Sequence, residues 1–217
     1  MIAAFALAAT LLTAAPADAA KEKAEAESMG RKVLGEFAEC VVQAHKPLAR
    51  KYVLTPADQR MSEEEFRKVA GARCLGFLRG KLRMRPQQYR AALAERLVAV
   101  ELKGQGPIDA ATKPALVWAM PKPSGRTDAE RQEAAAFAAA DVYVGKLGEC
   151  VVRANPAGAQ ALLATPIGDA AEMTAFRALG PAIPACVPNG ETLKLNRATL
   201  REGIAISYYR LAAGATS

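Results

Sequence analysis

The feature that most constrains the fold is an internal repeat. Shifting the 217-residue chain against itself by 110 positions aligns Val33–Arg67 with Tyr143–Arg177, with 11 identities in 35 positions. The first-copy members of these identities are Gly35, Glu39, Cys40, Val41, Val42, Ala44, Ala49, Thr55, Pro56, Phe66 and Arg67. Self-similarity at one offset indicates a tandem duplication, in which each copy is a supersecondary unit.

Each unit carries two cysteines at equivalent positions. Beyond the first stretch the alignment continues with small gaps and matches Cys74 with Cys186, then Leu82, Arg90 and Ala94 with Leu193, Arg201 and Ala205. Four cysteines allow three pairings. Only Cys40–Cys74 together with Cys150–Cys186 makes a single ancestral unit complete, so we predict that pairing. In the chain-entropy model each bridge contributes roughly 3 to 4 kcal/mol to stability.

Two successive helices are expected at the start of each unit. Apolar residues recur at intervals of three and four from Met29 to Ala44, which predicts one buried face of a helix that ends at Pro47. Its counterpart runs from the capping box Thr127-x-x-Glu130 to Pro156. A short second helix then begins at each proline and ends before Thr55-Pro56 or Thr165-Pro166.

A third and a fourth helix complete each unit. The third begins at the capping boxes Ser62-x-x-Glu65 and Asp169-x-x-Glu172, and prolines at 181 and 184 end it before Cys186. The fourth covers 86–102 and 197–213, after the alternating segments "KLRMRP" and "TLKLNR" that read as short extended pieces. We therefore expect an all-α fold of two tandem four-helix repeat units, each with one internal disulfide and a short extended segment before its last helix.

The chain begins with "MIAAFALAATLLTAAPADAA", in which 2–15 carry no charge and Ala17-Asp18-Ala19 matches the small-x-small pattern of signal peptidase sites. The apolar run is shorter than the roughly 18 to 20 residues that cross a bilayer, so we expect a cleaved signal peptide and no transmembrane anchor. Disulfides also suit an oxidising compartment. The expected divisions are a signal peptide at 1–19, a first repeat unit at 20–102, a Pro-rich connector at 103–127 and a second repeat unit at 128–217.

The motifs "ECVV" and "LLATP", a second cysteine about 35 residues later and a closing "LRE" helix resemble those of uncharacterised secreted bacterial tandem-repeat cysteine proteins. The resemblance covers residues 30–213 and implies no known activity. It agrees with the expected location, which is periplasmic or secreted.

The sequence lacks the common enzyme motifs. It has no GxSxG, HExxH, SxxK or GxGxxG, and "GFLRGKL" at 76–82 has neither the spacing nor the hydroxyl residue of a phosphate-binding loop. None of the cysteines forms a CxxC, and His45 is the only histidine. We therefore expect no metal site, no cofactor and a protein that is not an enzyme.

The glutamates beside the first cysteines, Glu39 and Glu149, are retained in both units. We interpret them as members of structural ion pairs. The arginines proposed as their partners are Arg67 or Arg90 for the first unit and Arg177 or Arg201 for the second. The alternative is that the two carboxylates meet between the repeats and perform acid–base chemistry in a hydrolase-like enzyme.

Positive charge is concentrated in the first unit. Residues 21–106 contain 18 basic and 11 acidic residues, whereas 107–217 contain 11 and 10. The excess includes a basic strip without acidic residues, whose members are Arg79, Lys81, Arg83, Arg85 and Arg90. Guanidinium groups match phosphates and carboxylates, which makes an anionic envelope lipid, a polysaccharide or an acidic protein a possible partner. A solvated face is the alternative for this strip.

Nucleic acid is not expected as a partner, because only Tyr89 is near the strip to stack on bases. The segment "LVWAM", 116–120, contains the only tryptophan; it either inserts into a partner or lipid surface or covers a gap between domains. The function expected from the whole sequence is an exported, non-enzymatic helical module of the cell envelope with a binding or interaction role.

Overall fold

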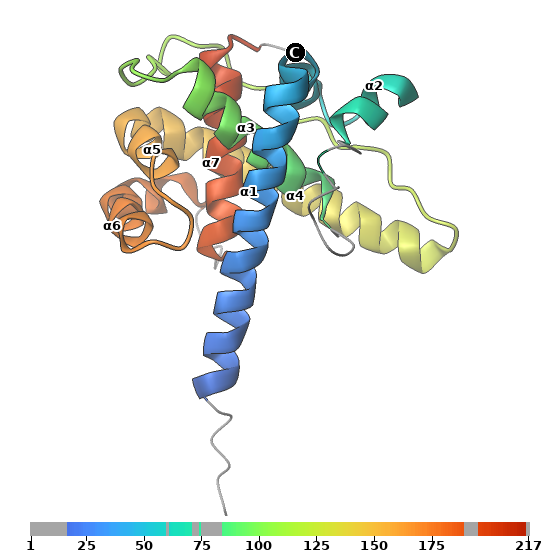
Figure 1. Ribbon diagram of the computed structural model, residues 1–217, viewed down its shortest axis with the longest axis horizontal. Helices are drawn as coiled ribbons and strands as arrows, with labels where there is room; N and C mark the ends of the chain where they lie inside the picture. Colours follow the sequence, from blue (N-terminus) through green and yellow to red (C-terminus); the bar gives the residue numbers. More distant parts are fainter. Residues whose placement is uncertain (1–16, 60, 71–73, 75–83, 189–194, 216–217) are drawn as a thin grey trace, which may run out of the picture.

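The chain is all-helical in the part that the computed structural model describes, residues 17–59, 61–70, 74, 84–188 and 195–215 (Figure 1). Seven α-helices and two short 3-10 helices make up this part, and it contains no β-strand. The expected fold class is therefore confirmed at the level of an all-α protein with two disulfides.

Both long helices are interrupted where the sequence places a proline. Helix α1, Ala17–Leu54, has non-helical backbone angles at His45 (φ −143°, ψ 43°), two residues before Pro47. Helix α4, Asp128–Ala154, ends at Asn155 (φ −150°, ψ 75°), and α5, Pro156–Leu163, follows it. Proline lacks the amide hydrogen that would continue the helical bonding pattern, so the chain bends at both places. The expected breaks are confirmed.

Two of the three expected capping boxes are present. Ser62 and Glu65 cap α2, Glu63–Val69, and Thr127 and Glu130 cap α4. The box expected at the start of α6, Ala170–Leu179, is wrong. Asp169 accepts a hydrogen bond from the amide of Ala171, but the Glu172 side chain does not reach back to it. Glu172 is turned towards two arginines instead, as described below.

The later helices lie close to their expected bounds. Helix α6 is followed by the 3-10 helices η2, Gly180–Ala182, and η3, Pro184–Cys186, so the prolines end the helix before the second cysteine as expected. Helices α3, Pro86–Glu101, and α7, Arg197–Ala212, are the fourth elements of the two halves. The first halves of the two expected extended segments, 81–83 and 192–194, lie outside the described residues.

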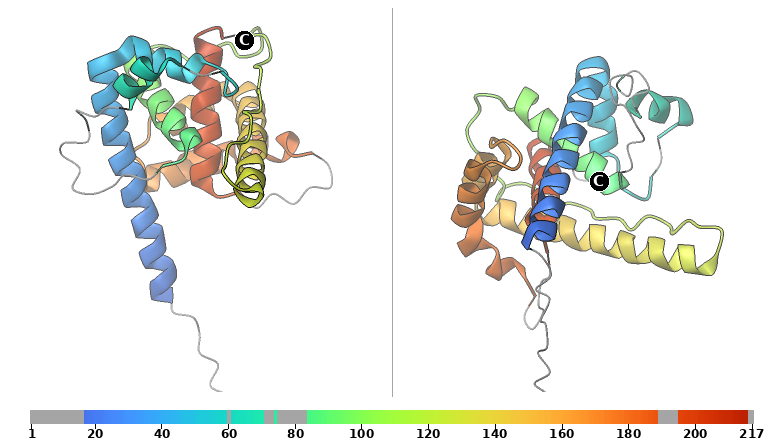
Figure 2. Two further views of the ribbon diagram at one scale, coloured as in Figure 1. Left: turned by 90° about the vertical axis from the view of Figure 1, so that its right-hand side faces the viewer. Right: turned by 60° about the horizontal axis from the view of Figure 1, so that its bottom comes forward.

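Helices α3 and α7 pack against each other at the centre, with α1 against α3 and α4 against α7 (Figures 1 and 2). One cluster of buried residues runs through both halves of the chain. Helices α4 and α7 approach closely where two glycines meet: a Cβ atom on Gly148 would lie 2.2 Å from the carbonyl carbon of Gly203. The first turns of α1 and α4 extend beyond this centre, and those of α4 lie on the same side as α2.

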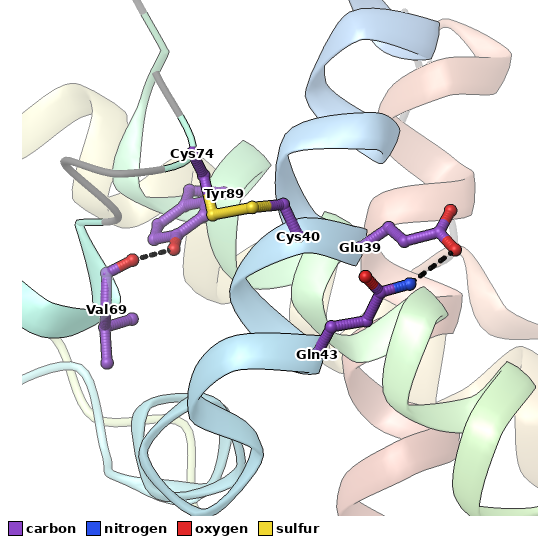
Figure 3. Close-up of a disulfide and its surroundings, with 6 residues drawn as sticks. All are labelled: Glu39, Cys40, Gln43, Val69, Cys74 and Tyr89. Carbon is purple, nitrogen blue, oxygen red and sulfur yellow. Dashed lines mark hydrogen bonds between the residues drawn. A yellow bond between two sulfur atoms is a disulfide. The ribbon is translucent and has the colours of Figure 1, made fainter. Parts of the chain in front are cut away.

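The disulfides are Cys40–Cys74 and Cys150–Cys186, as predicted. The first joins α1 to the chain that follows α2, beside Tyr89 of α3 (Figure 3). The Tyr89 hydroxyl donates a hydrogen bond to the Val69 carbonyl, so α3 holds the end of α2 as well. Each bridge thus fixes a short later element onto the long first helix of its own half.

Among the described residues, no helix combines the length and the apolar character that a bilayer crossing requires.

Candidate ligand-binding cavity

A cavity of about 790 Å³ lies among α2, the start of α3, the first half of α4 and the connector segment 117–124. This volume is within the range of roughly 300 to 1,000 Å³ that is usual for small-molecule sites. Its apolar lining includes Tyr52, Met61, Phe66, Val117, Trp118, Phe137 and Val142. Its charged lining comprises Arg85, Arg90, Lys122 and Arg210 with Glu63 and Asp141, so cations outnumber acids by four to two among the described residues.

The walls of this cavity expose large apolar side chains. Phe66 of α2 is 47% exposed, Val117 of the connector 49% and Phe137 of α4 46%. They are three of the six most exposed large apolar side chains in the described part of the chain. Apolar surface gathered around one concave site is typical of a binding site rather than of random surface composition.

Arg90 of α3 forms part of the cavity floor. Its Nη1 donates to the carbonyl of Thr55 at 2.8 Å, and its guanidinium carbon lies 5.1 Å from the centre of the Tyr52 ring. Burial lowers its pKa, while Tyr52 and Asp141 act in the opposite direction. No carboxylate among the described residues lies within ion-pair distance of Arg90.

Arg210 of α7 is the second cation of the floor, and it is buried at 2% exposure. Its Nη2 donates to the Val117 carbonyl at 3.1 Å and its guanidinium carbon lies 5.0 Å from the centre of a Trp118 ring. Its Nε has no hydrogen-bond partner among the described residues. Burial lowers the pKa of Arg210, the charge of Arg90 lowers it further, and Glu149 opposes both effects. Both arginines thus line the same cavity.

Arg85 and Asp141 lie at the edge of the floor. The guanidinium of Arg85 is 3.5 Å from the Asp141 carboxylate and lies 5.7 Å from the centre of the Phe137 ring. Burial raises the pKa of Asp141, and Arg85 and Arg90 lower it. This single acid faces two arginines and does not neutralise them fully.

The connector wall is fixed by Glu149 and Arg153 of α4. One oxygen of Glu149 accepts hydrogen bonds from the Leu116 amide at 3.0 Å and from Arg153, and the other accepts from Nε1 of Trp118 at 2.8 Å. Arg153 also donates to carbonyls of the connector, including that of Pro114 at 2.6 Å. The Trp118 ring lies on Gly145, where a Cβ atom would come within 2.2 Å of it. "LVWAM" therefore packs on α4 through Trp118, and both of its expected roles stay predictions.

A second cavity of about 520 Å³ lies on another side of the molecule, between α1, α3, α7 and 163–167. Its buried arginine, Arg201 of α7, is fully paired. Arg201 forms two bonds of 3.0 Å to the Glu95 carboxylate and a third of 3.0 Å to Glu172, and it donates to the Thr165 carbonyl at 2.9 Å. Arg31 of α1 binds the same Glu172 oxygen at 2.6 Å. Burial acts to raise the pKa of Glu172, but these contacts, led by Arg31, hold it below its usual value.

The two cavities occupy aligned positions of the two halves. Arg90 and Arg201 align at a shift of 111, and each donates to the carbonyl of the threonine in its own Thr-Pro pair. The residues around Arg201 have different counterparts around Arg90. At shifts of 110 or 111, Glu172 aligns with Ser62 and Glu95 aligns with Ile206. At the same shifts, Arg31 aligns with Asp141 and Ala99 aligns with Arg210. The acids that neutralise Arg201 are thus missing at the equivalent places around Arg90.

Another acid of the second cavity is Glu202. One of its carboxylate oxygens is buried without a hydrogen-bond partner in the described part of the chain. Burial raises its pKa to about 7, while Arg85 and Arg31 lower it and Asp141 and Glu95 raise it.

The residues expected to bind anions are only partly described. Arg79, Lys81 and Arg83 lie outside the described residues, so the basic strip stays a prediction. Arg85 and Arg90 are described, and both line the larger cavity.

The glutamates beside the cysteines are ion-paired, but with other arginines than those expected. Glu39 binds Arg96 at 2.6 Å, not Arg67 or Arg90, and Glu149 binds Arg153 at 2.8 Å, not Arg177 or Arg201. Arg153 lies one helical turn from Glu149, and Arg96 lies on the helix next to Glu39. Both are closer to these glutamates than the arginines retained in the repeat. Arg210 was not singled out from the sequence, because the alignment of the halves places an alanine opposite it.

In the described part of the chain, no group of three or more His, Cys, Asp or Glu side chains is placed to hold a metal ion. Comparisons of the chain with models of protein families, with curated protein sequences and with solved structures gave no match.

Proposed function

We propose that the protein is an exported, non-enzymatic helical module of the cell envelope that binds an anionic envelope component in the larger cavity. The observation that carries this proposal is the combination of exposed Phe66 and Phe137 walls with a floor formed by Arg90 and Arg210. Buried charge is costly unless an opposite charge compensates it. An anion with an apolar part satisfies both features of the cavity at once, which favours a lipid over a polysaccharide.

We also propose that the chain consists of two units derived from one ancestral helical unit. Three local features support this. Both long helices bend at the aligned residues His45 and Asn155, and each half has one disulfide between aligned cysteines. In addition, Arg90 and Arg201 bind the carbonyl of the aligned threonine. Under this proposal the two cavities are two copies of one ancestral surface, of which only the first is open to an anion.

The hydrolase-like alternative depended on Glu39 and Glu149 meeting between the repeats. Each instead has an arginine partner, and both oxygens of Glu149 accept hydrogen bonds from the connector or from Arg153. A carboxylate engaged in this way is poorly placed to accept a proton from a substrate. These contacts favour the binding module over the enzyme.

The proposal is tested by sedimentation with vesicles of phosphatidylglycerol and phosphatidylcholine, with vesicles of phosphatidylcholine alone as the control. We expect retention on the anionic vesicles that weakens as salt rises from 0.1 M to 1 M, since the screening length falls from about 10 Å to about 3 Å. Arg85→Gln should weaken retention, whereas Arg197→Gln, outside this cavity, should not. Equal retention on both kinds of vesicle, or on neither, would contradict the proposal.

A further inference from the structure

The floor of the larger cavity contains hydrogen-bond donors that the protein does not use. Nε of Arg210 and Nε2 of Gln87 are both buried without a partner among the described residues, and both side chains line this cavity. Arg90 and Arg210 each donate one bond to a backbone carbonyl, and a guanidinium has five N–H groups. Unused buried donors beside two arginines that form no ion pair among the described residues indicate a place for an acceptor that carries negative charge.

The second cavity indicates which kind of anion fits. There the aligned Arg201 binds the Glu95 carboxylate through two parallel bonds of 3.0 Å and adds a third to Glu172. Planar carboxylates match the fork of a guanidinium in this way. Arg90 is held by the same threonine carbonyl bond and by Tyr52, and it has no carboxylate partner among the described residues, so a carboxylate from outside the chain can take that place.

The walls indicate what is attached to the anion. Three elements contribute exposed apolar side chains to the cavity walls: Phe66 from α2, Val117 from the connector and Phe137 from α4. Each of these side chains is about half exposed. Apolar surface of this kind is stabilised by covering it, at about 25 cal/mol per Å². The cavity thus has a cationic end and an apolar remainder.

We propose that this cavity binds a single-chain amphiphile, with its carboxylate between Arg90 and Arg210 and its alkyl chain against Phe66 and Phe137. This inference rests on the proposed function and narrows it from an anionic envelope component to one class of ligand. It assigns a role to Arg210, whose counterpart in the other half is Ala99.

The test uses the chain's only tryptophan, Trp118, which lines the cavity and reports binding through its fluorescence. The probes are dodecanoate, dodecanol and acetate, which separate the charged head from the chain. We expect saturable binding of dodecanoate, at least about 10-fold tighter than dodecanol, because a hydrogen bond to a charged group contributes a factor of this order. Acetate should not bind measurably. Dodecanol that binds as tightly as dodecanoate would overturn the inference.

Variants locate the site. Arg90→Met and Arg210→Met should each weaken dodecanoate binding by about 10- to 100-fold. Arg201→Met, the matched change in the other cavity, should leave the affinity unchanged. If either floor variant fails to fold, Phe137→Ser decides the matter, because Phe137 is 46% exposed and its loss leaves the core intact. Unchanged dodecanoate affinity in Phe137→Ser would overturn the proposed location.

The inference and the proposed function fail in different ways. Retention on phosphatidylglycerol vesicles that dodecanoate neither prevents nor reverses would contradict the single-chain ligand and leave the broader function standing. Absence of binding to both the vesicles and dodecanoate would overturn both. Dodecanoate that displaces the protein from the vesicles would support both.

Discussion

Arg90 and Arg201 lie at aligned positions on α3 and α7 and make the same bond to a threonine carbonyl, yet their surroundings differ in charge. Arg201 forms ion pairs with both Glu95 and Glu172. Arg90 has a tyrosine ring, an apolar wall and a second cation near it. In both halves the arginine stabilises the Thr-Pro turn. Only Arg90 lacks a carboxylate partner among the described residues, so it is also available to bind a ligand.

The largest expected difference between the halves is in stability. Arg201→Met should lower the free energy of unfolding by about 3 to 5 kcal/mol, because it leaves Glu95 without its partner and the buried Glu172 with Arg31 alone. Arg90→Met should cost only about 1 to 2 kcal/mol, since it removes one carbonyl bond and a ring contact. Urea unfolding at pH 7 measures both. Equal losses would mean that the two arginines have equivalent surroundings after all.

The disulfides should affect the two halves alike. They close loops with separations of 34 and 36 residues, so the chain-entropy model assigns about 3 to 4 kcal/mol to each. Replacing Cys40 and Cys74 by alanine, and separately Cys150 and Cys186, should give the same drop in urea stability within about 1 kcal/mol. A much smaller drop for one pair would show that its half keeps its packing without the bridge.

The aligned glycines Gly35 and Gly145 provide a smaller and sharper contrast. A Cβ atom at Gly35 meets nothing within 4 Å, whereas one at Gly145 lies 2.2 Å from the Trp118 ring. Gly145→Ala should therefore cost about 1 to 3 kcal/mol and shift the Trp118 emission. Gly35→Ala should raise stability slightly, by about 0.5 to 1 kcal/mol, because alanine favours the helix. An unchanged emission spectrum in Gly145→Ala would contradict the placement of the connector.

The smallest expected effect is a pH dependence at Glu202, which aligns with the buried Ala91. Burial raises its folded-state pKa to about 7, above the unfolded value of about 4.3. The folded state therefore holds the proton more tightly, and stability falls as the pH rises from about 4.3 to 7. Glu202→Gln should remove this fall and be about 1 to 2 kcal/mol more stable at pH 8. Thermal unfolding at pH 4.5 and pH 8 tests this; parallel curves for both proteins would contradict it.

Local rules predicted much of the fold from the sequence. The breaks near Pro47 and at Pro156, the caps at Ser62 and Thr127, and the end of α6 follow from the chemistry of a few adjacent residues. The disulfides followed from the repeat. The buried face predicted for α1 begins too early in the sequence, because Met29 is 62% exposed where the helix extends beyond the core.

Much less of the candidate site could be predicted from the sequence. Its floor combines Arg90 with Arg210, which are 120 positions apart, and its wall comes from the connector. Glu172 left its expected capping box because Arg31, 141 positions away, binds it more strongly. Such choices depend on which helices pack together, and spacing along one helix carries no information about that.

Helices α1 and α4 each form an ion pair with the other half of the chain, which has a consequence for the history of the chain. Arg31 of the first half pairs with Glu172 of the second half, and the aligned Asp141 of the second half pairs with Arg85 of the first half. A single ancestral unit could not have supplied both sides of such a contact by itself. Under the duplication proposed above, the ancestor would have been a two-fold symmetric homodimer, in which each copy completed the other's cavity. Joining the copies through the connector would then have allowed the two cavities to diverge, one towards closure and the other towards an opening.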